Sequence, residues 1–383
     1  MTQTAKEDPI PMKSRVLMVS NSSRVVGGGE ISFWQLIKRL DRAHFEPVVV
    51  CPGKGPFCDL IEQLGTEYVL VDIPRFRGFG LFLLPRSVRD LQRLIKATRA
   101  DLVHANGSRC MIAAGLAGLF ARTPVLWHVR IIQRDGMLDW MLAALATKIA
   151  VSSTAVRKRF PKARPDKVAV VHNGVDMTEF RPDISGLSVR EELGWSGLET
   201  IVTTVGRLEP GKGQRCFLEA AALVAQECNS ARFLVVGEGD DRAELQALAD
   251  RLGLKGLVKF TGARSDLPSI MAASNMVVSA APSEGFGRSL VEAMATGKPV
   301  VATAGGGASD IVADGETGIL IPPNDPAKLA QALLTLIEAP DEARLLGERG
   351  LARARECFTS EQHARRIEEL YLGVLDGVRR KAR

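Results

Sequence analysis

The chain has 383 residues, a length that favours two domains over a single core. Its composition, 46% hydrophobic and 25% charged with 36 glycines, is typical of a soluble α/β protein rich in tight turns. The six cysteines form no CxxC motif and no metal-ligand spacing with histidines, so we expect reduced, mostly buried thiols of a cytosolic protein.

The sequence shows no signal peptide and no membrane span. The first 13 residues are polar, and the longest apolar run, 110–121, lies between two arginines and is too short to cross a bilayer. We therefore expect a cytoplasmic location.

Charge is unevenly distributed between the two halves. Residues 1–180 carry 26 Lys and Arg against 16 Asp and Glu, a net charge of +10, whereas the remainder carries 24 against 28, a net charge of −4. A basic half favours an anionic partner such as a lipid surface, a phosphorylated acceptor or nucleic acid. A generally basic proteome is the alternative explanation.

The first predicted βα unit contains a glycine-rich turn. A short apolar strand at 15–20 is followed by Gly27-Gly28-Gly29 and then by an apolar helical pattern at 31–40. Glycines at such a turn let a phosphate or sugar approach the backbone closely. The turn does not match GxGxxG, so a dinucleotide fingerprint is not supported.

Strands and helices continue to alternate through the first half. The predicted strands lie at 47–51, 68–73, 102–104, 125–128 and 148–152, with a helix at about 56–64. This alternation predicts a parallel sheet, which collects ligands at the carboxyl ends of its strands. His104 and His128 stand at such ends, and Arg130 follows His128; a hydrogen-bonded structural histidine is the alternative for both.

Two basic stretches of this half favour contact with an anionic membrane surface. Residues 75–86 place aromatic and aliphatic residues between arginines, and residues 157–162 form a compact basic cluster. A core helix with solvated ends is the alternative. A polar stretch from Phe180 to Gly197 is the candidate linker between the domains.

The second half begins a new βα series. Strands are predicted at 200–205, 233–236, 258–261 and 276–279, and helices at 216–227, 241–252 and 267–273. Arg207 and Lys212 share one glycine-rich loop, a suitable pair of cations for a diphosphate, although solvated loop residues would look the same. Gln214 follows Gly213, so the loop is not a Walker A motif.

Residues 284–303 form a loop, a helix and a strand that carry two carboxylates. Glu284 precedes the glycine-flanked turn, Ser289 is the predicted helix cap, and Glu292 lies one turn inside the helix, about 10 Å from Glu284. Free N–H groups at the helix start attract phosphate, so a nucleotide sugar fits between the carboxylates. In the alternative, Ser289 and Glu292 form only a capping box.

The last part of the chain is mostly helical. A glycine-rich turn at 304–310 and a short strand near 319–323 precede helices predicted at 326–338, 341–357 and about 360–380. No Asp-x-Asp motif occurs, so the usual carboxylate pair for a nucleotide-bound divalent metal is missing. We expect no metal site.

Taken together, these segments resemble glycosyltransferase family 4, the retaining transferases of the GT-B fold. The resemblance covers nearly the whole chain, and Glu284 and Glu292 reproduce the family's E-x7-E spacing. It is densest over HNGVD (172–176), VGRLEPGKG (205–213), VVGEGD (235–240), EGFGRSLVEAMATGKPVVAT (284–303) and the GGG…DGETGILIPP tail (305–323).

The resemblance implies two Rossmann-like doubly wound domains that face each other across a cleft. Residues 1–180 would form the acceptor domain, together with a C-terminal helix at 360–383 that crosses back to it. Residues 181–359 would form the domain that binds the nucleotide-sugar donor.

The resemblance also assigns roles around the nucleotide. Arg207 and Lys212 would hold the diphosphate, and Glu292 would take the ribose hydroxyls. Backbone donors at the helix start would come from Gly287, Arg288, Ser289 and Leu290. Gly262 and Arg264 would lie near the base.

Around the donor sugar, the resemblance implies Glu284, the backbone of Gly285 and Phe286, and His128. Gly28 and Gly29 would approach the phosphates. The chain departs from the family at Asp310, where glutamate is usual, and after His128, where Val-Arg replaces the usual Asp. The second departure suggests that Arg130 contacts the acceptor.

The expected reaction moves a sugar from a nucleotide diphosphate to a glycan or lipid-linked acceptor, with no cofactor. Arg207, Lys212 and the helix dipole would stabilise the leaving diphosphate without metal. No carboxylate is an obvious nucleophile of the kind that retaining glycosidases use, and for the family same-face attack is the usual proposal. No nucleic acid partner is expected.

Three other functions remain open at this point. A nucleotide-sugar epimerase of similar fold would convert the donor without an acceptor. A phosphorylase-like enzyme would need a pyridoxal lysine, for which no motif is present. A non-catalytic nucleotide-sugar binding protein would not need the cations of the leaving group.

Overall fold

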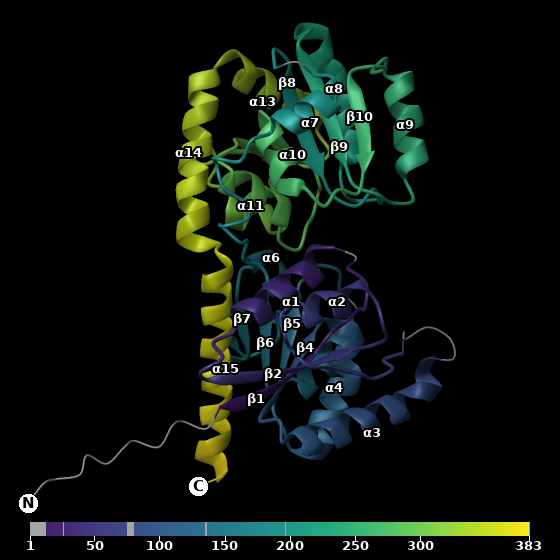
Figure 1. The fold of residues 1–383 in the computed structure, drawn as a ribbon, viewed down its shortest axis with the longest axis vertical. Helices are drawn as coiled ribbons and strands as arrows, with labels where there is room; N and C mark the ends of the chain where they lie inside the picture. Colours follow the sequence, from purple (N-terminus) through teal and green to yellow (C-terminus); the bar gives the residue numbers. More distant parts are fainter. Residues whose placement is uncertain (1–12, 26, 75–79, 135, 196, 383) are drawn as a thin grey trace, which may run out of the picture. The chain divides into compact units, whose positions relative to one another are not determined.

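The computed structural model describes residues 13–25, 27–74, 80–134, 136–195 and 197–382 (Figure 1). The opening residues 1–12 and residues 75–79 of the first basic stretch lie outside this description. The chain divides into two compact units. The first comprises Met1–Val129, Gly136–Ala150 and Ala364–Arg383, and the second comprises Arg130–Asp135 and Val151–His363.

The first sheet has seven strands in the order β3-β2-β1-β4-β5-β6-β7. The strands are β1 (Ser14–Val19), β2 (Phe45–Cys51), β3 (Tyr68–Leu70), β4 (Leu102–Asn106), β5 (Val125–Val129), β6 (Lys148–Val151) and β7 (Val168–Val170). The helices are α1 (Gly28–Arg39), α2 (Pro56–Glu62), α3 (Gly80–Thr98), α4 (Ser108–Ala121), α5 (Met137–Leu145) and α6 (Thr154–Arg157), with a 3-10 turn at Pro165–Lys167.

In this sheet, strands β1 to β3 follow one another toward one edge, and strands β4 to β7 follow one another toward the other edge. Right-handed crossovers therefore place α1 and α2 on one face and α3, α4 and α5 on the other. The central strands are buried on both faces, and Val16, Leu17, Met18 and Val19 are completely inaccessible to solvent. This explains why the strand appears in the sequence as a continuous apolar run instead of an alternating one.

The second sheet has six strands in the order β10-β9-β8-β11-β12-β13. The strands are β8 (Thr200–Val205), β9 (Ala231–Val236), β10 (Val258–Gly262), β11 (Met276–Ser279), β12 (Val300–Thr303) and β13 (Ile319–Ile321). The helices are α7 (Leu187–Glu192), α8 (Gln214–Glu227), α9 (Arg242–Arg251), α10 (Leu267–Ala273), α11 (Arg288–Ala295), α12 (Ala308–Ile311), α13 (Pro326–Glu338) and α14 (Pro340–Cys357). The last helix, α15 (Ser360–Ala382), belongs to the first unit from Ala364 onward.

The helices of the second unit enclose a core on each face of its sheet. One core joins residues of α8, α9 and α13, including Phe217 and Leu333. The other core joins α11 and α14 with the loop that carries Phe286. The order of the strands reverses between β8 and β11: β8 to β10 follow one another toward one edge of the sheet, and β11 to β13 toward the other. In open α/β sheets, ligands bind at this point.

The predicted linker at 180–197 is wrong. Helix α7 lies inside it, and Val189, Leu193 and Trp195 are buried in a core shared with β8 and α10. A side chain at Gly186 would come within 2.2 Å of the backbone of Ala273, so this stretch packs closely against α10. The polar residues that suggested a linker form the outer face of a packed segment.

The predicted domain boundary at residue 180 stays a prediction. The first sheet continues through β7 to Val170, whereas the division by contacts assigns residues from Val151 to the second unit. Within the described residues, no helix combines the length and the apolar character needed to cross a membrane.

Candidate functional site

Lys212 and Glu284 contact each other beside β8 and β11, where the strand order of the second sheet reverses. Lys212 lies in the loop after β8, and Glu284 lies in the loop after the adjacent strand β11. The Lys212 Nζ atom donates to Glu284 Oε1 at 2.8 Å, and both side chains remain about one quarter exposed. The sequence singled out both residues but did not predict that they contact each other.

Glycines bring the neighbouring loops into contact with this pair. Gly213 has a φ of +80°, and a Cβ atom there would lie 2.1 Å from the carbonyl oxygen of Ala280 after β11. Gly306, with a φ of +61°, packs equally closely on the backbone of Glu284. Only glycine fits both the left-handed backbone and the lack of space, so three loops converge at the carboxyl edge.

The β8 loop is also held by a residue that the sequence did not assign to the site. The side-chain amide of Gln214 donates to the carbonyl oxygen of Arg207 at 2.8 Å, and Gln214 is buried. Arg207 itself is half-exposed and donates to Glu209 Oε1 at 2.6 Å. The loop backbone is therefore fixed, while the guanidinium of Arg207 is accessible to solvent.

Helix α11 begins differently from the prediction. Its N-cap is Gly287, in a left-handed conformation and without a side-chain cap, so Ser289 does not cap the helix. The capping-box alternative for Glu292 is wrong as well, because Glu292 Oε1 instead accepts from Arg288 Nε at 2.6 Å. Both side chains of this i, i+4 pair are largely buried, at 12% and 6% exposure.

The start of α11 leaves part of its backbone available. The N–H of Leu290 already donates to the carbonyl oxygen of Gly287 at 3.0 Å, so its proposed role as a phosphate donor competes with this bond. The ring of Phe286 is buried between His172 and Phe358, with ring centroids about 6 Å apart in each case. Its backbone, and not its ring, is therefore the part that a ligand could contact.

Gly262 and Arg264, expected near the base, lie at the end of β10: Gly262 is its last residue, and Arg264 follows in the next loop. Gly262 has a φ of +77°, and its carbonyl accepts from the N–H of Gly237 at 2.9 Å. Arg264 contacts two carboxylates, Asp266 at 2.8 Å and Glu192 at 2.5 Å. The hydrogen bond from Arg264 holds the pKa of Asp266 below its usual range, and that of Glu192 is likewise lowered.

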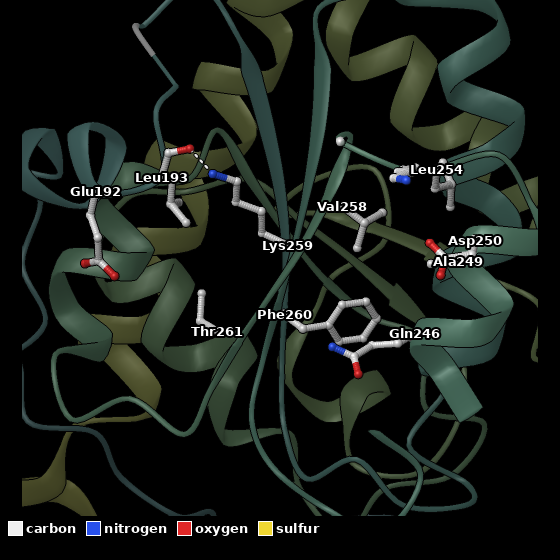
Figure 2. Close-up of a pocket in the computed structure, with 12 residues that line it drawn as sticks. Glu192, Leu193, Gln246, Ala249, Asp250, Leu254, Val258, Lys259, Phe260 and Thr261 are labelled. Carbon is white, nitrogen blue, oxygen red and sulfur yellow. Dashed lines mark hydrogen bonds between the residues drawn. The ribbon is translucent and has the colours of Figure 1, made fainter. Parts of the chain in front are cut away.

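A cavity of about 670 Å³ lies beside the edge strand β10, and Glu192 forms part of its wall. Figure 2 shows residues of β10 between those of α7 and those of α9, with Lys259 donating to the carbonyl oxygen of Leu193. None of the predicted nucleotide or sugar residues lines this cavity. The candidate site is therefore defined by the converging loops and not by this cavity.

His128, at the end of β5 in the first unit, is completely buried and contacts His104. The two imidazoles are joined through His128 Nδ1 and His104 Nε2 at 3.3 Å, and His104 Nδ1 lies 2.6 Å from the hydroxyl of Tyr371. Tyr371 comes from α15, so the last helix contributes to this buried group. Gly28 and Gly29 were predicted in the turn before the helix, but they lie in the first turn of α1, because this helix begins at Gly28 with Gly27 as its N-cap.

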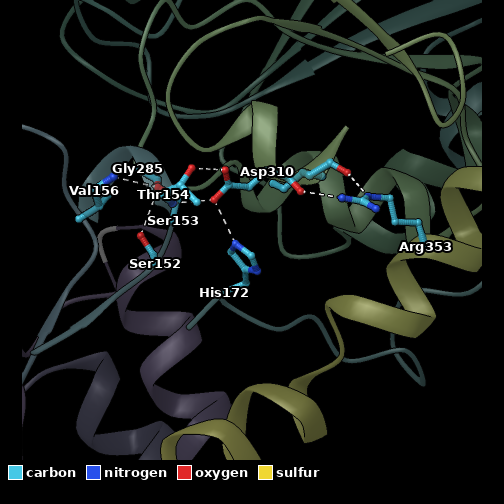
Figure 3. A network of polar contacts seen from close by, with 9 residues as sticks. Ser152, Ser153, Thr154, Val156, His172, Gly285, Asp310 and Arg353 are labelled. Atoms are coloured by element: carbon cyan, nitrogen blue, oxygen red, sulfur yellow. Dashed lines mark hydrogen bonds and ion pairs between the residues drawn. The ribbon is translucent and has the colours of Figure 1, made fainter. Parts of the chain in front are cut away.

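Arg130 and Asp310, at which the chain departs from the family, both make specific contacts. Arg130 Nε donates to Asn173 Oδ1 at 3.0 Å. Asp310 accepts from the N–H of Thr154 at 2.7 Å, from the Thr154 hydroxyl, and from His172 Nε2 at 3.0 Å (Figure 3). Burial acts to raise the pKa of Asp310, but the hydrogen bonds from His172 and Thr154 outweigh it, and its pKa is lowered.

The network in Figure 3 also includes Gly285, in the loop that carries Glu284. The hydroxyl of Ser152 donates to the carbonyl oxygen of Gly285 at 3.1 Å, and Arg353 donates to the carbonyl oxygens of Asp310 and Ile311. The loop after Glu284 is thus held by a hydrogen bond from Ser152 as well. Across the described ranges, no group of three or more His, Cys, Asp or Glu residues is arranged to hold a metal ion.

Two family models match successive parts of the chain. The model described as Glycosyltransferase Family 4 matches residues 26–179, and the model described as Glycosyl transferases group 1 matches residues 188–353. The chain belongs to the family 4 glycosyltransferases. The second match contains Arg207, Lys212, Glu284 and Glu292, and the first contains His128.

Individual relatives agree with this membership. A D-inositol 3-phosphate glycosyltransferase of Streptomyces scabiei is 34% identical over 58% of this glycosyltransferase and 52% of its own length. A UDP-Gal:alpha-D-GlcNAc-diphosphoundecaprenol alpha-1,3-galactosyltransferase of Escherichia coli is 25% identical over 79% of this chain and 83% of its own length. The crystal structure of Anabaena Alr3699/HepE in complex with UDP and glucose superimposes with a TM-score of 0.82, at 29% identity, over 93% and 98% of the two chains.

These comparisons establish the GT-B fold and the family membership. The aligned region spans about half of the length of the first curated relatives, the D-inositol 3-phosphate glycosyltransferases. Several contacts of the candidate site were not predicted from the sequence: Gln214, Tyr371, Asn173, Thr154 and His172. The HNGVD motif (172–176), one of the segments that resemble the family, was the available signal for His172 and Asn173, but no role followed from it for either residue.

Proposed function

We propose that this glycosyltransferase moves a hexose from a UDP-sugar to a hydroxyl of a lipid-linked or cell-envelope glycan or another small glycoside, with retention and without metal. The Lys212–Glu284 contact carries the proposal, because it puts a cation for the diphosphate and a carboxylate for sugar hydroxyls within 2.8 Å of each other. The Anabaena relative, bound to UDP and glucose, supports the donor. The Escherichia coli relative, whose name includes a diphosphoundecaprenol acceptor, supports the acceptor class.

In this proposal, Glu292 accepts hydrogen bonds from the ribose hydroxyls, and Arg288 donates to the same buried carboxylate. The N–H groups at the start of α11 and the side chains of Lys212 and Arg207 surround the diphosphate. Gly28 and Gly29 approach the phosphates, and Gly262 and Arg264 lie near the base. His128 and Glu284 contact the donor sugar, and Arg130 contacts the acceptor.

The transfer step breaks the bond between the anomeric carbon and the β-phosphate oxygen, and the electron pair leaves with UDP. The acceptor oxygen bonds to the anomeric carbon on the same face, and its proton passes to the departing phosphate oxygen. Lys212, Arg207 and the α11 dipole stabilise the charge that develops on this oxygen, which supplies the role that a divalent ion plays elsewhere.

The test is incubation with UDP-sugars, with and without a lipid-linked glycan acceptor, in the presence of either EDTA or magnesium. We expect UDP release that depends on the acceptor, unchanged turnover in EDTA, and an α-linked product from an α-linked donor. Sugar conversion without an acceptor would instead indicate the epimerase. Binding without turnover would indicate a non-catalytic module, and loss of activity in EDTA would refute metal independence.

A further inference from the structure

Exposed apolar and basic side chains gather on one face of the first unit, formed by α3 and the C-terminal end of α4. Phe82 and Leu83 of α3 are 81% and 43% exposed, and Leu119 and Phe120 of α4 are 61% and 60% exposed. Large apolar side chains that group on a surface usually mark an interaction site. We name these four residues, together with Arg86, Arg89 and Arg93, the α3–α4 face.

The two helices make this face continuous. The side-chain amide of Gln92 in α3 donates to the carbonyl oxygen of Phe120 in α4 at 3.4 Å. Between the helices lies a cavity of about 360 Å³, which is lined by Leu84, Pro85, Val88, Arg89, Gln92, Leu116 and Phe120. The lining of this cavity is mostly apolar, and Arg89 and Gln92 are its polar members.

The outer surface of α3 adds a row of positive charge. Phe82, Arg86, Arg89 and Arg93 recur at spacings of three and four residues and therefore lie on one side of the helix. Their side chains are exposed, and Asp90 is the only acidic residue of α3. Asp90 lies within 4 Å of both Arg86 and Arg93, so the helix keeps a net positive charge.

We propose that the α3–α4 face docks on the surface of an anionic lipid bilayer. Exposed aromatic and leucine side chains enter the boundary between headgroups and acyl chains, while arginines with long apolar stems reach the lipid phosphates. Three exposed arginines in a row along the outer side of α3 suit an extended anionic surface. The net charge of +10 on residues 1–180 also favours binding to an anionic surface.

This location includes part of the first basic stretch that the sequence suggested, since Phe82, Leu83 and Arg86 lie within residues 75–86, but not the second. In the predicted basic cluster at 157–162, Arg159 is only 4% exposed and donates to the carbonyl oxygen of Ile131, and Arg157 donates to that of Phe160. Lys158 and Lys162 are exposed. The cluster is therefore largely occupied with structural contacts, and the α3–α4 face presents more charge to solvent.

The proposal deepens the proposed function in one respect, since it supplies the surface on which a lipid-linked acceptor would be met. The test uses the full chain without substrates, sedimented with phosphatidylcholine vesicles that contain one third phosphatidylglycerol, and with pure phosphatidylcholine vesicles. We expect binding to the anionic vesicles only. Salt should weaken it, because exposed charges are screened beyond about 10 Å at 0.1 M salt.

Variants locate the docking surface. Replacing Arg86, Arg89 and Arg93 by alanine should lower vesicle affinity about 100-fold, from about fivefold for each arginine. Phe82→Ser with Phe120→Ser should lower it at least tenfold, whereas Leu198→Ser, at a residue of the second unit that is 89% exposed, should have no effect. UDP affinity, measured by calorimetry on the same samples, should stay unchanged in every variant.

Three results would overturn the proposal. One is the absence of binding to anionic vesicles at low salt, and another is equal binding to neutral ones. The third is a loss of binding in Trp140→Ser, on the exposed side of α5, while the α3–α4 variants bind like the unmodified protein. Because UDP affinity is measured separately, vesicle binding without UDP binding would refute the proposed function alone, and the reverse would refute only the docking.

Discussion

Replacing Glu284 by glutamine separates the sugar part of the donor from its nucleotide part. In the free protein, Glu284 accepts a hydrogen bond from Lys212 at 2.8 Å, with about a quarter of each side chain exposed. Under the proposed function, binding of UDP requires Lys212 to turn toward the phosphates and to give up part of this contact. The variant removes the competing charge but keeps the size and shape of the side chain.

The magnitudes follow from the exposure of the pair. A partly exposed ion pair contributes about 1 kcal/mol, so UDP should bind to Glu284→Gln as well as to the unmodified protein, or up to about fivefold more tightly. The intact UDP-sugar loses a hydrogen bond to a charged group, which contributes about 1.5–3 kcal/mol, so its affinity should fall by about 10-fold to 100-fold. Turnover should fall further if the contact strengthens as the sugar flattens toward its transition state.

The assay is one calorimetric titration with UDP, one with the UDP-sugar, and a rate at saturating donor. Glu348→Gln is the matched control, because Glu348 accepts from Arg344 at 2.6 Å on the exposed surface of α14, far along the chain from the loops of the site. It should change none of the three measurements. Equal losses of affinity for UDP and UDP-sugar in Glu284→Gln would refute the placement of Glu284 at the donor sugar.

Four further variants test the remaining assignments. Arg207→Ala should lower turnover at saturating donor by about 100-fold or more, since one preorganised charge contact contributes about 3–4 kcal/mol; a near-normal rate would remove it from the leaving-group site. Glu292→Gln should weaken UDP binding and lower the melting temperature, because buried Arg288 loses its counter-ion, and adding Arg288→Met should restore melting but not binding. Asp310→Asn should lower the free energy of unfolding by about 2 kcal/mol at neutral pH. Since the folded pKa of Asp310 is depressed, this difference should disappear as the pH falls through that pKa, below 3.8, in denaturant titrations across pH. Tyr371→Phe should lower turnover about tenfold and shift its pH profile with UDP affinity unchanged, because the hydroxyl that fixes the tautomer of His104 is lost; an unchanged profile would make Tyr371 merely structural.

The sequence predicted the order of elements well because each strand and helix has a local pattern. The run at 200–205 is a strand because it is β-branched and apolar, and 326–338 is a helix because its apolar positions recur at helical spacing. The predicted linker was wrong for the same reason. Polar residues around Val189 and Trp195 form a local loop pattern, while the packing of these two side chains is decided by distant parts of the chain.

The sequence also located the loops of the candidate site, but it did not give the partners of their charged residues. Glu292 fits a capping box locally, and only the left-handed backbone of Gly287 shifts the helix start so that Arg288 becomes its partner. Likewise, the predicted basic cluster at 157–162 includes Arg159, whose guanidinium is buried against the carbonyl of Ile131. Exposure depends on which segments pack over a residue, and that is not encoded within a short window of sequence.

By itself, the sequence determined the alternation of strands and helices, the glycine-rich loops and the residue types that identify a family 4 glycosyltransferase. Tertiary structure alone decided which of these residues meet. Lys212 and Glu284 are 72 residues apart along the chain, and His104 and Tyr371 are 267 apart. Local propensities act over a few residues, whereas these contacts arise when the strand order brings β8 beside β11 and packing brings α15 against β4.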